Sequence, residues 1–383
     1  MQNDTNARGA YADFTLLVDG KNAFPEIIKC IENAKASVYI NMFIWRDDEI
    51  GNRVARAVLT AAERGAEVYI SVDRYGVVLE KAEESKKSFF HKQQTLVEKL
   101  KTRSLELAYP MENAPKKAND TESELYLAIM SHPNIKVSRD EFKADHSKYY
   151  IIDDEILFLG GINIEDKENG ADMQGRVYGD YMAKLVGAQY VEAFRAKLAR
   201  GEDLSDEYFF RANVKLGDPY RFEMEGAYLD MIDSAKEELH ITMAYFSPLK
   251  KFVDAIVGAH NRGVKVTVMI PERANFQSDT NHKTVKKLLR LTDNGIRVLL
   301  SPRMLHTKMV INDEYISFGS TNITKKAFGQ LSELNLFVKN VDSEFKSTLM
   351  SDVEKNYEMS RCVSDYKEIK YNRLLAFIEG FLV

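Results

Sequence analysis

His146-Ser-Lys-Tyr-Tyr-Ile-Ile-Asp-Asp-Glu-Ile-Leu-Phe-Leu-Gly160 returns in similar form 160 residues later as His306-Thr-Lys-Met-Val-Ile-Asn-Asp-Glu-Tyr-Ile-Ser-Phe-Gly319. Each copy carries the pattern His-x-Lys-x4-Asp, and each is followed by an asparagine, in Gly-Gly-Ile-Asn163 and Gly-Ser-Thr-Asn322. One His-x-Lys pair is expected by chance in a chain of this length, but two pairs with the same downstream asparagine are not. The duplication predicts one active site built from two equivalent halves.

Each copy is predicted to form a strand, a tight polar turn and a second strand. Side chains two positions apart on a strand point to the same face of the sheet. His146 and Lys148 should therefore project together, as should His306 and Lys308. The aspartates of the motif lie five residues beyond the lysines, in the turns.

Four positions of the motif are assigned structural rather than chemical roles. Asp153 and Asp313 fall in the turns, where we expect them to hold the hairpins by accepting hydrogen bonds from backbone N–H groups. Gly161 and Ser320 stand two residues before the asparagines and are counted with the framework of the motif.

The repetition extends well beyond the two motifs. An amphipathic helical pattern followed by a buried, strand-like pattern occurs twice in each half. The pairs of segments are residues 24–35 with 37–45, 57–65 with 66–72, 227–236 with 239–246, and 255–263 with 264–270. The second helix of each half ends on glycine, Gly65 or Gly263, a common C-terminal cap. Alternating helices and strands favour α/β sandwiches whose sheets are covered by helices.

The chain has 383 residues, more than most single-core domains, so we expect two fused halves at 1–200 and 201–383. The first half is longer between its repeated elements, and we assign the excess to an insertion at about 77–133. Residues 79–103 of this insertion are predicted to form helices, and 110–115 an irregular loop near the site entrance. A surface decoration and a lid or membrane-contact element are both open interpretations of the insertion.

The composition is that of a folded globular protein, with 45% hydrophobic and 29% charged residues. The formal net charge of -5, with no continuous basic stripe interleaved with aromatic residues, leads us to expect no nucleic acid partner. Cys30 and Cys362 are not in metal-ligand spacing, so neither a zinc site nor a disulfide framework is indicated, and a reducing compartment fits. The polar start, 1–19, and the lack of a long apolar run predict neither a signal peptide nor a membrane anchor.

Two imidazoles, two ammonium groups and two amides suit the chemistry of a phosphodiester. One imidazole can attack phosphorus to form a phosphohistidine, while the other, as an imidazolium, protonates the departing oxygen. The two lysines and the amides of Asn163 and Asn322 can hold the non-bridging oxygens, where charge collects in the transition state. This scheme requires no metal and no other cofactor.

An attacking or donating imidazole also needs an acceptor that fixes its second ring nitrogen. Asp180 and Glu333 are acids at comparable distances downstream of the two motifs. We expect Asp180 to orient one histidine and Glu333 the other. Spacing alone leaves open which acid serves which ring.

The two motifs and their flanking segments resemble the phospholipase D superfamily, from about residue 12 to 341. Within that superfamily the more detailed match is to bacterial cardiolipin synthases. The matching segments are 48–51, 64–65, 73–76, 158–164, 245–248, 262–264, 278–279, 306–308, 319–322 and 333–335. The resemblance implies a fold of two pseudo-symmetric α/β/α sandwich halves of the phospholipase D type, fused in one chain.

The resemblance also implies an activity. One phosphatidylglycerol would load its phosphatidyl group onto a histidine with loss of glycerol, and a second phosphatidylglycerol would accept the group to give cardiolipin. Analogy with the superfamily favours His146 as the attacking residue, although the near symmetry of the copies leaves the choice open. We expect a cytoplasmic bacterial enzyme attached peripherally to the cell membrane, and the sequence indicates no oligomeric state.

Other functions stay open at this point. Hydrolysis of a phospholipid to phosphatidic acid would use the same residues with water as the acceptor. A phospholipase D-type nuclease is disfavoured by the acidic charge balance, and a lipid-binding scaffold without catalysis is disfavoured because both motif copies are intact.

The C-terminal residues 367–383 are predicted to form an amphipathic helix with a basic lead-in. Its apolar positions are Leu374, Phe377, Ile378, Phe381 and Leu382, and the preceding basic positions are Lys367, Lys370 and Arg373. Such a helix can lie in a lipid headgroup layer or pack on the core of its own protein, and both interpretations are kept.

Overall fold

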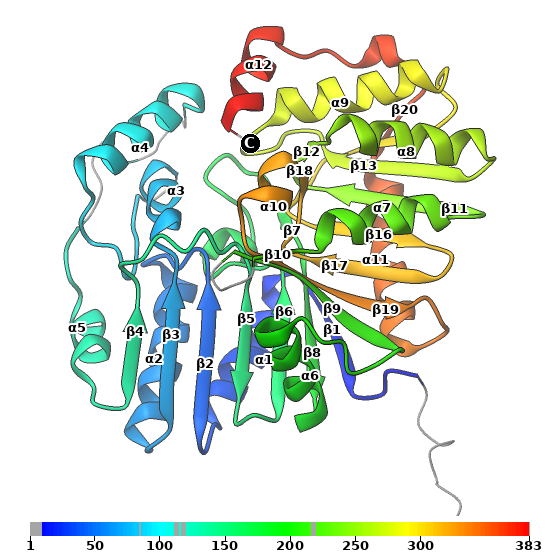
Figure 1. Ribbon diagram of the computed structural model, residues 1–383. Coiled ribbons are helices and arrows are strands. Elements are labelled where there is room, and N and C mark those ends of the chain that lie inside the picture. Colours follow the sequence, from blue (N-terminus) through cyan, green and yellow to red (C-terminus); the bar gives the residue numbers. More distant parts are fainter. Residues whose placement is uncertain (1–9, 84–85, 111–114, 116–119, 216–219, 383) are drawn as a thin grey trace, which may run out of the picture.

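The computed structural model describes residues 10–83, 86–110, 115, 120–215 and 220–382, whose longer strands form two mixed sheets (Figure 1). The first sheet has the order β1 (Phe14–Val18), β8 (Tyr181–Val186), β6 (Ile156–Gly160), β5 (Tyr149–Ile152), β2 (Ser37–Met42), β3 (Glu67–Val72) and β4 (Ile135–Ser138). The second has the order β10 (Arg221–Phe222), β9 (Tyr208–Val214), β19 (Glu333–Lys339), β17 (Tyr315–Gly319), β16 (Lys308–Asn312), β11 (Glu238–Met243), β13 (Lys265–Pro271), β14 (Arg297–Ser301) and β20 (Arg361–Val363).

The two strand orders correspond strand for strand, from β1 to β4 in the first sheet and from β9 to β14 in the second. In both sheets the last three strands of this series run parallel, while the other neighbours are antiparallel. Two short parallel pairs join other segments, β12 (Phe246–Ser247) with β18 (Ile323–Thr324), and β15 (Met304–Leu305) with β7 (Tyr178–Gly179). The matching orders confirm the duplicated α/β architecture.

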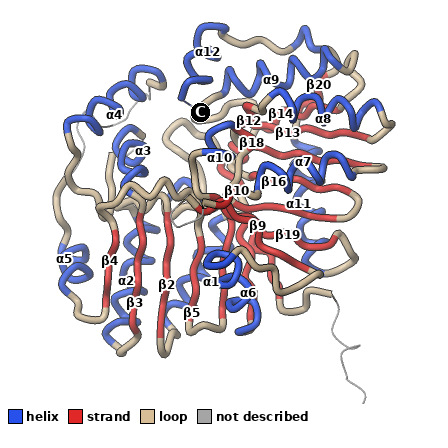
Figure 2. The backbone as a smooth tube through the Cα atoms, viewed as in Figure 1, coloured by secondary structure: helices blue, strands red, loops and turns tan. Residues whose placement is uncertain are grey.

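Helices cover the outer face of each sheet (Figure 2). They are α1 (Gly20–Glu32), α2 (Glu49–Glu63) and α5 (Glu124–Ser131) on the first sheet, and α7 (Met224–Ser234), α8 (Lys250–Asn261) and α9 (Ser278–Leu291) on the second. α2 shows why these segments are helical. The Asp48 carboxylate accepts the Gly51 N–H at 2.9 Å and so caps the first turn, while Val54, Val58 and Ala61 form a buried stripe at helical spacing.

The inner faces of the two sheets share one core, to which α6 (Ala188–Arg200) and α11 (Glu344–Met359) contribute. Leu157 and Leu159 of β6 are fully buried there, with Phe318 of β17 and Leu336 of β19. Burial of one such side chain contributes roughly 1.5–3 kcal/mol. This shared core fixes the halves against each other and brings their motif hairpins together.

The junction between the halves lies in α6 and the segment after it. The first sheet ends with β8 at Val186, and β9 of the second sheet begins at Tyr208. Gly201 follows α6 with φ of 77°, and its N–H donates to the Lys197 carbonyl. This left-handed conformation suits glycine and turns the chain. The boundary predicted at residue 200 lies beside this turn and stays a prediction.

The insertion of the first half adds helices, as the sequence predicted. α3 (Val77–Ala82) and α4 (Leu96–Ala108) precede α5. Residues 111–114 of the expected loop lie outside the described residues. Among the residues that are described, none of the helices combines the length and the apolar character that crossing a bilayer requires.

The motif strands begin later than predicted, and this part of the prediction was wrong. β5 starts at Tyr149 and β16 at Lys308, so both motif histidines precede their strands. The residues just before the histidines pair with the opposite half instead, because Asp145 forms a bridge with Ser332 and Leu305 lies in β15. Backbone groups bonded across the halves cannot continue the ladder of their own sheet. The histidines are therefore placed by these crossing contacts and not by strand alternation.

The turn aspartates accept backbone hydrogen bonds, but from a different segment than expected. Asp153 accepts the N–H groups of Lys35, Ala36 and Ser37 at 2.7–3.0 Å, from the loop that leads into β2. Asp313 accepts those of residues 236–238, which lead into β11. Each carboxylate thus ties the motif hairpin to the neighbouring loop rather than closing the hairpin itself.

Replacing either aspartate by asparagine should lower stability and leave the chemistry intact. These hydrogen bonds hold the pKa of both carboxyl groups below its ordinary value despite partial burial. A lowered folded-state pKa stabilises the protein above the pKa of the unfolded chain, and the gain is lost as pH falls through the folded value. We expect Asp153→Asn and Asp313→Asn to lower the melting temperature at neutral pH, by less in acid. The control is Asp154→Asn, in the same turn, and normal melting with lost turnover would contradict the structural role.

Candidate active site

His146 is held by the opposite half at both its backbone and its ring. Its N–H donates to the Ser332 carbonyl at 2.8 Å, and the Ser332 N–H donates to the Ala144 carbonyl at 2.7 Å. The next residue, Glu333, places its carboxylate oxygens 3.1 and 3.2 Å from His146 Nδ1, and the Ser320 carbonyl oxygen lies 3.2 Å from the same nitrogen. Glu333, predicted to orient a histidine, therefore contacts the ring of His146.

These contacts fix the protonation of the His146 ring. A carbonyl oxygen only accepts, so Nδ1 carries the proton and Nε2 keeps its lone pair. Burial lowers the pKa of His146 well below its ordinary value, and the Lys148 and Lys308 ammonium groups lower it further. Burial also raises the pKa of Glu333 to about 8. The neutral ring with a lone pair on Nε2 is the nucleophilic form of imidazole.

His306 is held in the same manner but meets two carboxylates. Its N–H donates to the Gly179 carbonyl at 2.8 Å, in the segment that carries Asp180. Its Nδ1 lies 3.0 Å from Asp180 Oδ2 and 3.1 Å from Glu168 Oε1, without the alignment of a hydrogen bond to either. Burial opposes the charge of Asp180, but Lys308 and His306 bring its pKa below the ordinary value. Asp180, the other acid predicted to orient a histidine, thus contacts the ring of His306.

Glu168 is a site residue that the sequence did not predict. It lies in the 3-10 helix η2 (Asp166–Asn169), five residues after the first motif asparagine, and the equivalent position of the second half holds Ala327. Comparison of the two copies therefore could not reveal it. Its carboxylate is buried, and neither oxygen has a hydrogen-bond partner in the described part of the chain. With Asp180 and His306 it presents ligand atoms within 4.8 Å of one another, close enough to share a proton or to hold a small cation.

The two motif lysines form a buried pair of like charges. Lys148 and Lys308 are fully buried, and each Nζ donates to the carbonyl of the histidine two residues before it. Burial and the neighbouring Lys308 ammonium lower the pKa of Lys148 to about 7, and burial also lowers that of Lys308. Asp180 Oδ2 lies 3.5 Å from Lys308 Nζ, and an anion between the two lysines would add a counter-charge that relieves the remaining repulsion.

The two motif asparagines, and the small residues Gly161 and Ser320, make different contacts in the two halves. Asn322 Oδ1 accepts the Tyr245 N–H at 3.1 Å, which leaves its NH2 group to donate, and the buried Asn163 follows β6 as Asn322 follows β17. A Cβ on Gly161 would come within 2.2 Å of Asp180 Oδ2. At the matching position, the Ser320 hydroxyl donates to Glu333. The two histidines, the two lysines and their acids thus meet where the two halves join.

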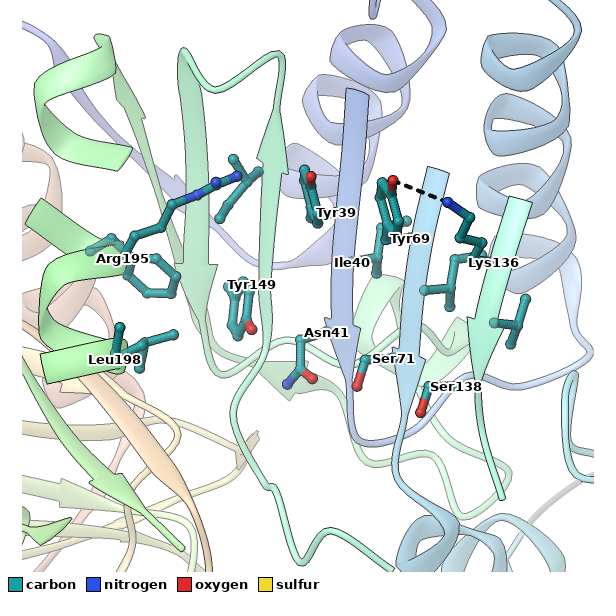
Figure 3. Close-up of a pocket in the computed structure, with 15 residues that line it drawn as sticks. Tyr39, Ile40, Asn41, Tyr69, Ser71, Lys136, Ser138, Tyr149, Arg195 and Leu198 are labelled. Atoms are coloured by element: carbon teal, nitrogen blue, oxygen red, sulfur yellow. Dashed lines mark hydrogen bonds between the residues drawn. The ribbon is translucent and has the colours of Figure 1, made fainter. Parts of the chain in front are cut away.

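The structure also contains a cavity of about 760 Å³, whose lining residues Figure 3 shows. It opens on the inner face of β2, β3 and β4, where Tyr39 and Tyr69 stack at 4.7 Å and α6 contributes Arg195. None of the eight residues predicted for the chemistry lines it. Asn41 at its edge donates to the Ser147 carbonyl at 3.1 Å, so the cavity touches the back of the first motif loop.

Comparison with known proteins agrees with the duplicated geometry. Residues 27–174 and 228–359 match the family described as "Cardiolipin synthase, PLD-like domain". A cardiolipin synthase of Staphylococcus aureus is 24% identical over 371 residues, which cover 91% of this chain and 69% of that protein. A cardiolipin synthase of Listeria monocytogenes is 25% identical over 371 residues, covering 90% and 70% of the two chains.

Among solved structures, phosphatidylserine synthase of Haemophilus influenzae superposes with a TM-score of 0.70 at 13% identity, covering 97% of this chain and 92% of that one. Polyphosphate kinase of Porphyromonas gingivalis gives a TM-score of 0.51 at 10% identity, covering 89% and 50%. These likenesses show a shared fold.

The buried lysine pair should bind a small dianion with uptake of protons. Sulfate keeps its charge over the neutral range, so any pH dependence of its binding reports on the protein. Because burial and the Lys308 ammonium lower the pKa of Lys148 to about 7, sulfate affinity should fall as pH rises above that value. Calorimetry in buffers of different ionisation enthalpy measures the protons taken up.

Lys148→Met should weaken sulfate binding by about tenfold or more and remove most of the proton uptake. Lys136→Met, at the solvent-exposed end of β4, is the matched control and should bind as the wild type does. Equal affinity for sulfate in Lys148→Met, or affinity that does not change with pH, would contradict this account of the pair.

Proposed function

Because the chain belongs to the cardiolipin synthase family of PLD-like domains, we propose that it is a phosphatidyltransferase that acts on phospholipid phosphodiesters through a phosphohistidine. Cardiolipin synthesis from two phosphatidylglycerols, with release of glycerol, is the proposed reaction. The observation that carries the proposal is the crossed pairing of His146 with Glu333 and of His306 with Asp180, around two buried lysines.

In the first step His146 Nε2 attacks phosphorus. The new P–N bond forms as the bond between phosphorus and the glycerol oxygen breaks, and His306 gives its proton to that oxygen. Glycerol leaves, and the phosphatidyl group stays on His146. General acid catalysis of this kind is typically worth about 10²–10⁴ in rate.

In the second step the neutral His306 takes the proton of a hydroxyl on a second phosphatidylglycerol. The alkoxide oxygen attacks phosphorus, the P–N bond breaks, and His146 returns to its neutral form. The product is cardiolipin, and His306 is again protonated for the next cycle. Lys148 and Lys308, with the two asparagine amides, hold the non-bridging oxygens through both steps.

The unequal surroundings of the two rings support this division of roles. His146 has a lowered pKa and a free Nε2 lone pair, which suit a nucleophile. His306 has two carboxylates within 3.1 Å of Nδ1, and their negative charge stabilises the imidazolium that an acid requires. We therefore place Glu168 with Asp180 as a positioning residue for His306.

Mass spectrometry of lipids after incubation with phosphatidylglycerol vesicles tests the reaction. The wild type should form cardiolipin and glycerol, while His146→Ala and His306→Ala should each lose turnover by about 10²–10⁴-fold. His132→Ala, outside the site, should behave as the wild type. Phosphatidic acid as the main product would favour hydrolysis, and cleavage of DNA in chelator would favour a nuclease.

Glu168→Gln should slow the release of a leaving group that needs an acid. We expect about tenfold slower release of glycerol in the first turnover but little change in the first-turnover burst of p-nitrophenol from phosphatidyl-p-nitrophenol, whose leaving group departs without a proton. Exposed Glu192→Gln is the control and should change neither rate. Equal slowing with both leaving groups would contradict the role at His306, and loss of wild-type activity in chelator would instead assign Glu168 to a cation.

A further inference from the structure

Helix α4 presents its apolar side to solvent and its polar side to the protein. Leu96, Val97, Leu100 and Leu107 are 85%, 64%, 72% and 77% exposed. At 100° per residue they fall on one side of the helix, flanked by exposed lysines at 99 and 101. An amphipathic helix of a soluble domain shows the opposite arrangement.

The inner side of α4 is polar and bonded. Glu98 is buried and receives two hydrogen bonds from Arg74, at 2.8 and 3.0 Å, and Thr102 accepts one from Gln94 at 2.8 Å. The Thr95 capping box starts the helix. The helix is therefore fixed in this orientation by its polar side, and its apolar side is held outward.

The C-terminal helix α12 (Arg373–Leu382) repeats this arrangement independently. Its buried side contains Ala376 and Glu379, and the Glu379 carboxylate accepts the Thr280 N–H at 2.7 Å. Its outer side carries Leu374 and Ile378, which are 67% and 40% exposed, and Phe377, which is 60% exposed. The side chains of the last two predicted apolar positions, 381 and 382, lie outside the described residues. The structure thus turns the predicted apolar stripe outward, away from the core of the protein.

The two helices lie at the same end of the molecule (Figure 1) and both contact the start of α9. The Tyr109 hydroxyl at the end of α4 accepts the Gln277 N–H at 3.3 Å, and its ring lies 4.9 Å from that of Phe276. Tyr109 also interacts with Glu379 of α12, which caps the same turn of α9. The two outward apolar stripes therefore belong to one surface.

This surface adjoins the active site. A polar cavity of about 310 Å³ at the end of α4 is lined by Tyr109, Arg176 and Ala274 among others. Ala274 packs in one cluster with Tyr178, whose ring centroid lies 6.3 Å from that of His306. The side chains of Ala274 and Tyr178 thus lie between this cavity and the ring of His306.

We propose that the outward faces of α4 and α12 insert into the headgroup region of an anionic phospholipid bilayer and deliver lipid to the active site. This inference deepens the proposed function and rests on it for the lipid that is delivered. The charge of the surface fits the partner, because exposed basic residues border both stripes. They are Lys99, Lys101, Arg103, Lys367, Lys370 and Arg373. Apolar faces bordered by basic residues bind anionic membrane surfaces by burial and by charge together.

Flotation with vesicles tests the surface without any need for catalysis. Wild-type protein and the inactive His146→Ala variant should both float with phosphatidylglycerol–phosphatidylcholine vesicles, and much less with phosphatidylcholine alone or in high salt. Leu96→Glu with Leu100→Glu, and separately Leu374→Glu with Ile378→Glu, should each lower the partition coefficient by about tenfold or more. Leu204→Glu, an exposed leucine after α6, is the matched control and should bind as the wild type does.

A second readout separates this inference from the proposed function. Turnover of monomeric short-chain phosphatidylglycerol should be unchanged in the α4 and α12 variants, while turnover of vesicles falls with partition. Milder Leu100→Ser and Leu374→Ser variants serve if the acidic ones melt early. If the variants bind vesicles as well as the wild type does, the proposed membrane contact of α4 and α12 is wrong. The proposal would also be overturned if the wild type formed a dimer that does not bind vesicles and that Leu100→Glu dissociates. The apolar stripes would then form the contact between two copies of the chain.

Discussion

The exchange of backbone hydrogen bonds between the halves is the constraint from which the active site follows. His146 bonds to Ser332 and His306 bonds to Gly179, so each motif histidine is anchored on the segment that carries the opposite half's acid. The acid is then one residue away from the anchor and reaches the ring nitrogen without a flexible link. Preorganisation of this kind is what an electrostatically driven reaction needs, because groups already in place cost no reorganisation in the transition state. In each half the motif histidine depends on an acid from the other half.

The sequence allowed much of this arrangement to be predicted, because duplication makes a weak local signal visible twice. The helix and strand patterns, the α/β class and the motif histidines and lysines were accessible from the repeat. The start of the motif strands was not, because Asp145 and Leu305 pair with the opposite half, and periodicity within one segment carries no information about such contacts. Glu168 was missed for a related reason, since it has no counterpart in the second copy and becomes a neighbour of His306 only through the fold.

Two further features could be read only in three dimensions. The turn aspartates were expected to close their own hairpins, but Asp153 and Asp313 bond to loops more than a hundred and about eighty residues away in the chain, respectively. The predicted apolar stripe of the C-terminal helix left its orientation open, and the same holds for α4, because nothing in a helical pattern states which side faces inward. In both helices a buried glutamate, Glu98 or Glu379, decides the orientation.

The small residue and the acid both differ between the halves, because Gly161 and Asp180 of the first half correspond to Ser320 and Glu333 of the second. Asp180 stands against Gly161, where an added Cβ would collide with its carboxylate, and the longer Glu333 stands against the hydroxyl of Ser320. A change from glycine to serine in the first half alone displaces the acid, and a change from serine to glycine in the second leaves a carboxylate short of a donor. The small residue and the acid of each half can therefore be substituted only together. A single residue of one half cannot replace its counterpart in the other half.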